Sequence, residues 1–294
     1  MGRFAPSPTG PLHFGSLVAA IGSYCLARQE GGCWLVRIED LDRPRVVPGA
    51  ADEILRTLED CGMEWDGPVL YQSCRTARYE AALERLRGAG LIFVCGCSRK
   101  EVLASAPHVG EEGPLYPGTC RERIVSGRRP RALRIRVPKD LFCYVDGVFG
   151  PREQRLSAAV GDFVLRRADG LFAYQLAVVV DDAECGVTQV VRGADLLSST
   201  PRQIFLQTCL GYPVPDYIHL PLALAADGCK ISKRDGAAAA AGEELWRALR
   251  FLGQPVPKSL CGAPPVEVVA WGVEHFRLER VPTASAAVGA LTTS

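Results

Sequence analysis

The sequence predicts an α/β fold with a doubly wound parallel sheet, a cysteine-containing insertion and a short helical C-terminal segment. Strand-like apolar runs alternate with helical patterns along the chain, and charged side chains follow the ends of several runs. The chain has 294 residues, of which 48% are hydrophobic and 23% are charged. This length and composition suit a globular protein with a large core.

The run Trp34–Ile38 reads as a buried strand, and Glu39 follows its carboxyl end. Apolar spacing predicts helices over 50–61 and 76–87. The residues at 187–191 resume the strand pattern. The next helix begins at Ser199-Thr200-Pro201 and ends before Gly211.

The chain divides into five expected segments. They are the first half of the main α/β domain (1–94), a cysteine-containing insertion (95–145), the second half of the main α/β domain (146–236), a helical segment (237–280) and a disordered tail (281–294).

Two motifs offer groups suited to a nucleoside triphosphate. A proline- and glycine-rich turn carrying His13 precedes a helical pattern, and helix N-termini bind anions. Late in the chain, Lys230, Ser232 and Lys233 form a short basic loop. Together they could neutralise charge that develops during phosphoryl chemistry. The alternatives are a structural turn with a packed histidine, and a solvated basic turn.

Cysteine spacing indicates a metal site. The sequence has 12 cysteines; Cys95 and Cys97 follow an apolar strand, and Cys120 lies after a loop rich in glycine and proline. Converging thiolates suit zinc, which prefers four tetrahedral ligands. From spacing, the fourth ligand could be His108 or Tyr116. The alternative is a loop of reduced cysteines without metal.

Charge patterning leaves two questions open. Arginines gather between residues 121 and 136, and the alternation over 134–137 predicts a strand with one basic face. This face could track RNA phosphates, or it could be a solvated edge strand. Asp181 and Asp182 could bind magnesium, or they could form an acidic turn at the end of a strand.

Net charge and apolar runs indicate where the protein is located and which partners it can contact. The net charge is +1, so any RNA contact must come from a local patch. No apolar run approaches the ~20 residues of a membrane span, and the N-terminus lacks the pattern of a signal peptide. We therefore expect a cytoplasmic protein without membrane contact.

Several motifs together resemble the catalytic core of bacterial glutamyl-tRNA synthetases. These are class I synthetases with a Rossmann-like core and two signatures, "HIGH" and "KMSKS". Ser16 stands where the second histidine of the first signature would be, and Ile231 replaces the methionine of the second. The matching segments are Gly2–Gly10, Arg37–Asp42, Val178–Asp182, Val191–Asp195 and Lys230–Arg234.

About sixty residues follow Arg234, too few for a helical anticodon-binding region. The chain therefore resembles most the glutamyl-queuosine tRNA(Asp) synthetase family. The resemblance implies that glutamate is activated by ATP without tRNA and transferred to queuosine in the anticodon loop of tRNA(Asp). The rivals are a truncated synthetase that charges a tRNA 3′ end, and a zinc-stabilised RNA-binding protein without catalysis.

The resemblance also implies cofactors and site residues. It implies one structural Zn²⁺ held by Cys95, Cys97, Tyr116 and Cys120, with Mg²⁺ arriving with ATP, and we expect a monomer. The expected catalytic residues are His13, Lys230 and Lys233. The expected ATP-binding residues are His13, Gly15, Ser16, Lys230, Ser232 and Lys233. The expected glutamate-binding residues are Arg3, Phe4, Ala5, Pro6, Ser7, Glu39, Tyr174 and Arg192.

Overall fold

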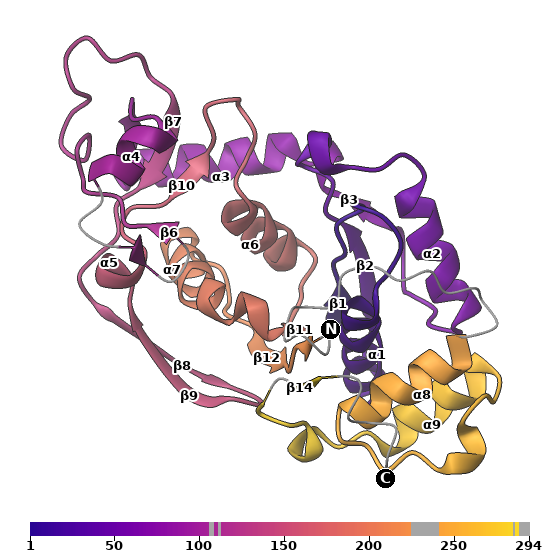
Figure 1. Cartoon of the computed structure of the whole chain (residues 1–294). Helices are drawn as coiled ribbons and strands as arrows, with labels where there is room; N and C mark the ends of the chain where they lie inside the picture. Colours follow the sequence, from indigo (N-terminus) through magenta and orange to yellow (C-terminus); the bar gives the residue numbers. More distant parts are fainter. Residues whose placement is uncertain (106–108, 111–112, 225–240, 285, 288–294) are drawn as a thin grey trace.

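A computed structural model of the chain describes residues 1–105, 109–110, 113–224, 241–284 and 286–287 (Figure 1). Its strands are β1 (Gly2–Phe4), β2 (Trp34–Ile38), β3 (Leu70–Tyr71), β4 (Ile92–Cys95), β5 (Val109–Gly110), β6 (Gly113–Pro114), β7 (Ala132–Ile135), β8 (Leu141–Asp146), β9 (Gly150–Arg155), β10 (Val164–Arg166), β11 (Gln189–Gly193), β12 (Asp216–Leu220), β13 (Ala223–Leu224) and β14 (Ala286–Ala287). Its helices are α1 (Phe14–Gln29), α2 (Ala50–Asp60), α3 (Thr76–Gly88), α4 (Arg99–Ser105), α5 (Leu156–Ala159), α6 (Tyr174–Glu184), α7 (Thr200–Leu210), α8 (Ala241–Phe251) and α9 (Pro265–His275).

The centre of the molecule is parallel sheet, as the sequence predicts. β1 pairs with β2, and β2 pairs with β3, all in parallel. On the other side of β1 lies β11, and the Met1 carbonyl accepts hydrogen bonds from the amides of Thr188 and Gln189 just before and at its start. β11 then pairs in parallel with β12, and β12 with β8. The carboxyl ends of β2, β1, β11 and β12 therefore meet along one edge.

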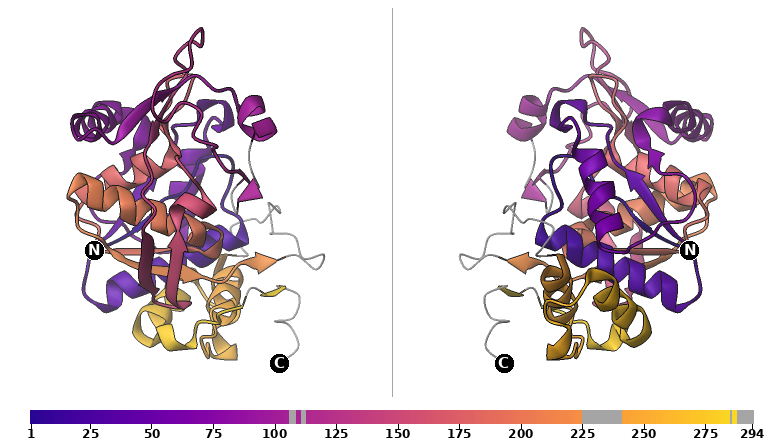
Figure 2. Two further views of the ribbon diagram at one scale, coloured as in Figure 1. Left: turned by 90° about the vertical axis from the view of Figure 1, so that its left-hand side faces the viewer. Right: turned by 90° about the vertical axis from the view of Figure 1, so that its right-hand side faces the viewer.

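Helix α1 fills one face of this sheet, and α8 and α9 pack against α1 from outside (Figures 1 and 2). The main core lies among these elements, and Ile21, Trp34 and Leu249 are buried there. The predicted C-terminal helices are confirmed, because Leu245 and Leu249 of α8 and Val268 of α9 all face this core.

A second sheet, β10–β7–β4, is antiparallel and lies at the opposite end of the molecule from α8 and α9 (Figure 2). The predicted strand around Arg134 is confirmed as β7, but the alternative that it is a solvated edge strand is wrong. β7 is the central strand, because β4 pairs with one side of it and β10 with the other. Arg134 on this strand is only partly exposed, and its Nη1 donates to the Asp162 carbonyl at 2.9 Å.

Three further sequence expectations meet the structure here. Helix α7 ends at Leu210 and is capped by Gly211, whose φ of 64° is left-handed, as a glycine just after a helical pattern predicts. In contrast, 178–182 is not a strand end but the middle of helix α6. The short β13–β14 pairing includes Ala286 and Ala287, while most of the rest of the expected disordered tail lies outside the described residues.

Gly22 tests how closely α1 approaches the sheet. A Cβ atom at Gly22 would lie 2.7 Å from Leu220 Cδ1 and 3.4 Å from Leu252 Cδ1. Alanine gains ~1 kcal/mol over glycine in a helix, but overpacking costs ~1–3 kcal/mol. We expect Gly22→Ala to lower the free energy of unfolding by about 1 kcal/mol, measured by urea denaturation. The control is Gly88→Ala, because no heavy atom lies within 4 Å of its added methyl group. This control should match or exceed the wild type, and equal stability of the two variants would contradict the close approach.

Candidate active site

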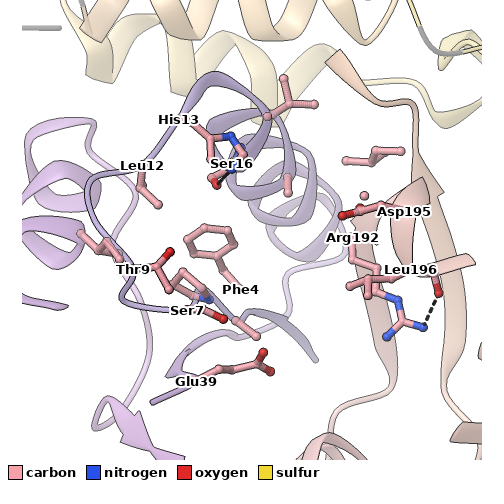
Figure 3. Close-up of a pocket in the computed structure, with 18 of the residues that line it drawn as sticks. Phe4, Ser7, Thr9, Leu12, His13, Ser16, Glu39, Arg192, Asp195 and Leu196 are labelled. Atoms are coloured by element: carbon pink, nitrogen blue, oxygen red, sulfur yellow. Dashed lines mark hydrogen bonds between the residues drawn. The ribbon is translucent and has the colours of Figure 1, made fainter. Parts of the chain in front are cut away.

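A cavity of about 540 Å³ opens where the carboxyl ends of β1, β11 and β12 meet the start of α1. Figure 3 shows His13 and Ser16 at one end, Glu39 at the other, Phe4 between them and Arg192 on the facing wall. The structure thus brings together every described residue that the sequence assigned to glutamate or ATP. These residues are Arg3, Phe4, Ala5, Pro6, Ser7, His13, Gly15, Ser16, Glu39, Tyr174 and Arg192.

The proposed phosphate end of the cavity is built by the start of α1. His13 is the N-cap residue, and its Nδ1 accepts a hydrogen bond from the Ser16 amide at 3.1 Å. A neutral imidazole then carries its proton on Nε2, which lies 3.1 Å from the Ser16 hydroxyl. Gly15 allows the ring to fold over the helix start, because a Cβ there would lie 3.2 Å from His13 Cε1. The Nε2–H can donate to an anion, and the hydroxyl of Ser16 adds a second donor.

The floor of the cavity is held by a buried cluster of charges. Arg37 on β2 pairs with Asp182 on α6 and, at 3.3 Å, with Glu39. Arg3 on β1 reaches the same Asp182 at 3.4 Å and donates to the Val191 carbonyl at 3.1 Å. These guanidinium groups are almost fully buried, so the two arginines and two carboxylates offset one another's charge.

The two carboxylates, Asp182 and Glu39, have pKa values shifted in opposite directions. Burial opposes ionisation of Asp182, but the charges of Arg37 and Arg3 outweigh it and hold its pKa below the usual range. Burial raises the pKa of Glu39 above its ordinary value, although Arg37 and Arg3 oppose that rise. Glu39 is thus a carboxylate at a cavity wall whose charge a bound cation would stabilise. Tyr174, the first residue of α6, lies in the same wall, and burial raises the pKa of its phenol.

Arg192 lies at the end of β11 as predicted, but its guanidinium is largely engaged by the protein. Nε donates to His219 Nε2 at 3.0 Å, Nη1 to Gln203 Oε1 at 2.8 Å, and Nη2 to Thr200 Oγ1 at 2.8 Å. Its side chain is buried, yet it still lines the cavity. The contact between Arg192 and glutamate that we expect from the sequence stays a prediction. It would use the guanidinium N–H that these contacts leave over.

Asp181 and Asp182 do not form the acidic turn that the sequence suggested. Both are buried within α6. Asp181 accepts hydrogen bonds from Tyr79 at 2.9 Å and Arg75 at 2.6 Å, and Asp182 pairs with Arg37. Because these donors already satisfy both carboxylates, neither is placed to hold magnesium.

Sequence reasoning missed Arg37 and Asp182 as residues that shape the site. The signal for Arg37 was a charged residue inside an otherwise apolar strand, which requires a buried counter-ion. Its partner Asp182 could not be named, because it lies 145 residues away in the chain. Thr9, Arg45 and Asp195 also line the cavity.

The cysteines converge as the spacing predicts. The sulfur atoms of Cys95, Cys97 and Cys120 all lie within 4.8 Å of one another. The Tyr116 hydroxyl is 3.4 Å from the sulfur of Cys95 and accepts a hydrogen bond from the Cys120 amide at 2.8 Å. Burial opposes ionisation of Cys120, but backbone donors, led by the Gly96 amide, lower its pKa to about 7. The group could therefore hold a metal ion.

Three arginines contact this cluster or the aromatic rings beside it. Arg128 donates to the sulfur of Cys97 at 2.9 Å, and the guanidinium of Arg134 lies 4.1 Å from the centre of the Tyr116 ring. Arg136 stacks on Phe93 at 5.1 Å. These three arginines therefore stabilise the local structure around the cysteines. Exposed arginines of the same stretch remain available to phosphates, and they are Arg123, Arg129 and Arg131.

Four predicted site residues cannot be placed. Lys230, Ser232 and Lys233 of the basic loop lie outside the described residues, and so does His108. Among the described residues, no helix combines the length and apolarity needed to cross a membrane.

Comparison with known proteins defines the class first. Residues 1–256 match the family described as tRNA synthetases class I (E and Q), catalytic domain. The chain also superposes on a glutamate tRNA ligase from Elizabethkingia meningosepticum, solved in complex with its amino acid, with a TM-score of 0.79 and 26% identity. That match covers 97% of this chain and 66% of the longer ligase. The chain is therefore a class I synthetase catalytic domain of the glutamate and glutamine group.

Relatives with similar sequences identify the family within this class. A glutamyl-Q tRNA(Asp) synthetase from Dechloromonas aromatica is 60% identical over 289 residues, which is 97% of this chain and 96% of the relative. One from Geobacter sulfurreducens is 56% identical over 297 residues, covering 97% and 95% of the two chains. This chain belongs to the glutamyl-Q tRNA(Asp) synthetase family.

The buried cluster predicts how stability depends on pH. Removing one partner of a buried ion pair costs ~3–5 kcal/mol, so Asp182→Asn should lower the free energy of unfolding by that amount near pH 7. The pKa of Asp182 is depressed on folding, so its contribution is present above about pH 4 and is lost as pH falls through the lower folded value. The difference between wild type and variant should therefore shrink below about pH 4, measured by denaturant unfolding at several pH values.

The control for this prediction is Glu80→Gln. Glu80 pairs with Arg166 at 3.2 Å, but the two side chains are 42% and 38% exposed. Exposed pairs contribute ~0–1 kcal/mol, so this variant should stay close to the wild type. If Asp182→Asn behaves like Glu80→Gln, the cluster does not hold the floor of the site.

Proposed function

We propose that this chain activates L-glutamate with ATP in the absence of RNA, and then transfers the glutamate to the queuosine base in the anticodon loop of tRNA(Asp). The observation that carries the proposal is the cavity at the strand ends. It is lined by a carboxylate and arginines and, at its other end, by a helix start that can bind an anion. The acceptor follows from the names of relatives that are 52–60% identical to this chain.

The first step joins glutamate to AMP. An oxygen of the glutamate α-carboxylate attacks the α-phosphorus of ATP, and pyrophosphate leaves with the electrons of the broken P–O bond. The reaction needs positioning and charge stabilisation rather than a protein nucleophile. His13 Nε2–H and the start of α1 would meet the phosphates from one side. Lys230 and Lys233 would meet them from the other, with Mg²⁺ bound to ATP.

Recognition of glutamate follows from charge. Glu39 would pair with the α-ammonium group, which favours ionisation of a carboxylate that burial disfavours. Arg3 and Arg192 lie on neighbouring strands and would attract the carboxylates. Glutamine lacks the side-chain negative charge, so these arginines would be left incompletely paired in its complex.

In the second step a hydroxyl of queuosine would attack the carbonyl carbon of the adenylate, and AMP would leave. A tRNA 3′ end would be attacked in the same way, so the acceptor needs its own test. Purified protein, ATP and labelled glutamate are incubated with tRNA(Asp) that contains or lacks queuosine. Labelling that requires queuosine supports the proposal, and labelling of both tRNAs at the 3′ end would replace it.

A structural zinc ion fits the cysteine cluster. With Zn–S bonds of ~2.3 Å, tetrahedral geometry sets two sulfurs about 3.8 Å apart, and Cys97 and Cys120 lie 3.7 Å apart. A metal here would tie the end of β4 to the 116–120 loop. Tyr116 would complete the four ligands and leave no position for a catalytic water.

We expect glutamate-dependent exchange between ATP and pyrophosphate without RNA. Lys233→Ala should slow the exchange by ~10²-fold or more, because one preorganised contact to the transition state is lost. The control is Lys258→Ala, an exposed lysine in a 3₁₀ turn, which should leave the rate unchanged. Absence of exchange by folded wild-type protein would contradict the catalytic function, and a normal rate for Lys233→Ala would make the basic loop structural.

We also expect about one zinc ion per chain on metal analysis. Cys95→Ser and Cys120→Ser should lose it, whereas Cys143→Ser, which changes an exposed cysteine on β8, should keep it. Comparing Tyr116→Phe with His108→Ala decides which of these two residues is the fourth ligand. If the histidine variant loses zinc and the tyrosine variant keeps it, Tyr116 is not the ligand.

A further inference from the structure

A chain of buried polar groups leads to Arg192 from residues outside the lining of the cavity. It begins at Asp146 on β8, passes through His219 on β12 and reaches the Nε of Arg192 on β11. Asp146 Oδ2 lies 2.5 Å from His219 Nδ1, and His219 Nε2 lies 3.0 Å from Arg192 Nε. Each of the three side chains is buried.

The strand register explains why these residues meet. Arg192 and His219 are direct partners across the parallel β11–β12 pair. Asp146 pairs with Tyr217 on the other side of β12. Side chains of facing residues in neighbouring strands point to the same face of a sheet, so the histidine is set beside the arginine by backbone pairing.

The donor arrangement fixes one tautomer of His219. An arginine Nε can only donate, so His219 Nε2 must present its lone pair, and Nδ1 must carry the proton. That proton is directed at Asp146. The carboxylate also accepts hydrogen bonds from the backbone amides of Val148 and Phe149, at 3.0 and 2.9 Å. Burial and the nearby Arg192 charge lower the pKa of His219, in agreement with a neutral ring.

The other edges of the guanidinium are also held. Nη1 donates to Gln203, while Nη2 donates to Thr200 and, at 3.4 Å, to the Leu196 carbonyl. Arginine has five N–H groups, so one N–H on Nη1 remains after these four contacts within the described part of the chain. Gln203 in turn donates to Gln175 at 2.9 Å.

Gln175 directly follows Tyr174, the residue of α6 that lines the cavity. The network therefore links two walls of the pocket, one on β11 and one on α6. Most N–H groups of the Arg192 guanidinium donate to other protein groups. The direction of the remaining N–H therefore depends on how His219 and Gln203 orient the guanidinium plane.

We infer that His219, held by Asp146, is a positioning residue that aims the free donor of Arg192 at the carboxylate of the bound amino acid. The inference rests on the proposed function, because it assumes that Arg192 contacts glutamate. A residue with a merely structural role would affect folding stability and leave the KM for glutamate unchanged.

Two substitutions of His219 separate the two hydrogen bonds of its ring. In His219→Gln, the amide oxygen can occupy the place of Nε2 and accept from Arg192. In His219→Asn, the shorter amide can replace Nδ1 and donate to Asp146, but it cannot reach Arg192. Both variants lose the imidazole ring, so the comparison isolates the contact with the arginine.

The readout is ATP–pyrophosphate exchange, with KM measured separately for glutamate and for ATP. We expect His219→Asn to raise the KM for glutamate about 10-fold or more, with the KM for ATP within about twofold of wild type; a tenfold change corresponds to about 1.4 kcal/mol. His219→Gln should recover most of this loss. The control is Gln254→Leu, which removes a buried amide hydrogen-bonded to the Arg277 carbonyl, outside the residues lining the cavity. It should lower the thermal midpoint and leave both KM values unchanged.

Unchanged KM for glutamate in His219→Asn, or an equal rise in both His219 variants, would overturn the inference. If His219→Asn does not fold, Asp146→Asn takes its place, because an amide donating to Nδ1 would favour the opposite tautomer and turn a proton toward Arg192. A normal KM for glutamate in that variant would overturn the inference as well. Wild-type protein that shows no glutamate-dependent exchange would instead refute the proposed function, so the two failures are distinguishable.

Discussion

The buried contact between Arg37 and Asp182 is the interaction on which the catalytic half of the structure depends. Arg37 belongs to β2, near the N-terminus, and Asp182 belongs to α6, in the second half of the chain. Each charge offsets the burial cost of the other, because an unpaired buried charge costs several kcal/mol. Arg3 on β1 joins the same carboxylate. The pair thereby fixes α6 against the sheet.

The Arg37–Asp182 contact affects the cavity through Glu39. The carboxylate follows β2 by one residue and shares Arg37 with Asp182. Arg37 and Arg3 hold the pKa of Asp182 low, while burial keeps the pKa of Glu39 raised. The fold thus leaves a carboxylate at the wall that gains from an incoming ammonium group. Tyr174 is set nearby because it begins the helix that Asp182 anchors.

The cysteine cluster is organised by different forces and at a different place. It lies at the end of β4, in the antiparallel sheet remote from α8 and α9. A small hydrophobic group of its own surrounds it, and Arg128 and Arg134 supply positive charge beside the sulfurs and the Tyr116 ring.

Local patterns in the sequence determined much of this protein. The strand at 34–38, the helices near 50–61 and 76–87, and the helix stop at Gly211 were predicted because periodicity and capping act over a few residues. The cysteine cluster and the strand-end cavity also followed, since parallel strands bring their carboxyl ends to one edge.

Only the tertiary structure decided what distant charges do. It placed Asp181 and Asp182 inside a helix, made β7 a central strand and gave most of the Arg192 donors to His219, Gln203 and Thr200. A sequence reports that a residue is charged, but a buried charge takes its role from the partner that folding brings to it. Those partners lie up to 179 residues away, as for Arg3 and Asp182, and local pattern carries no record of such pairings.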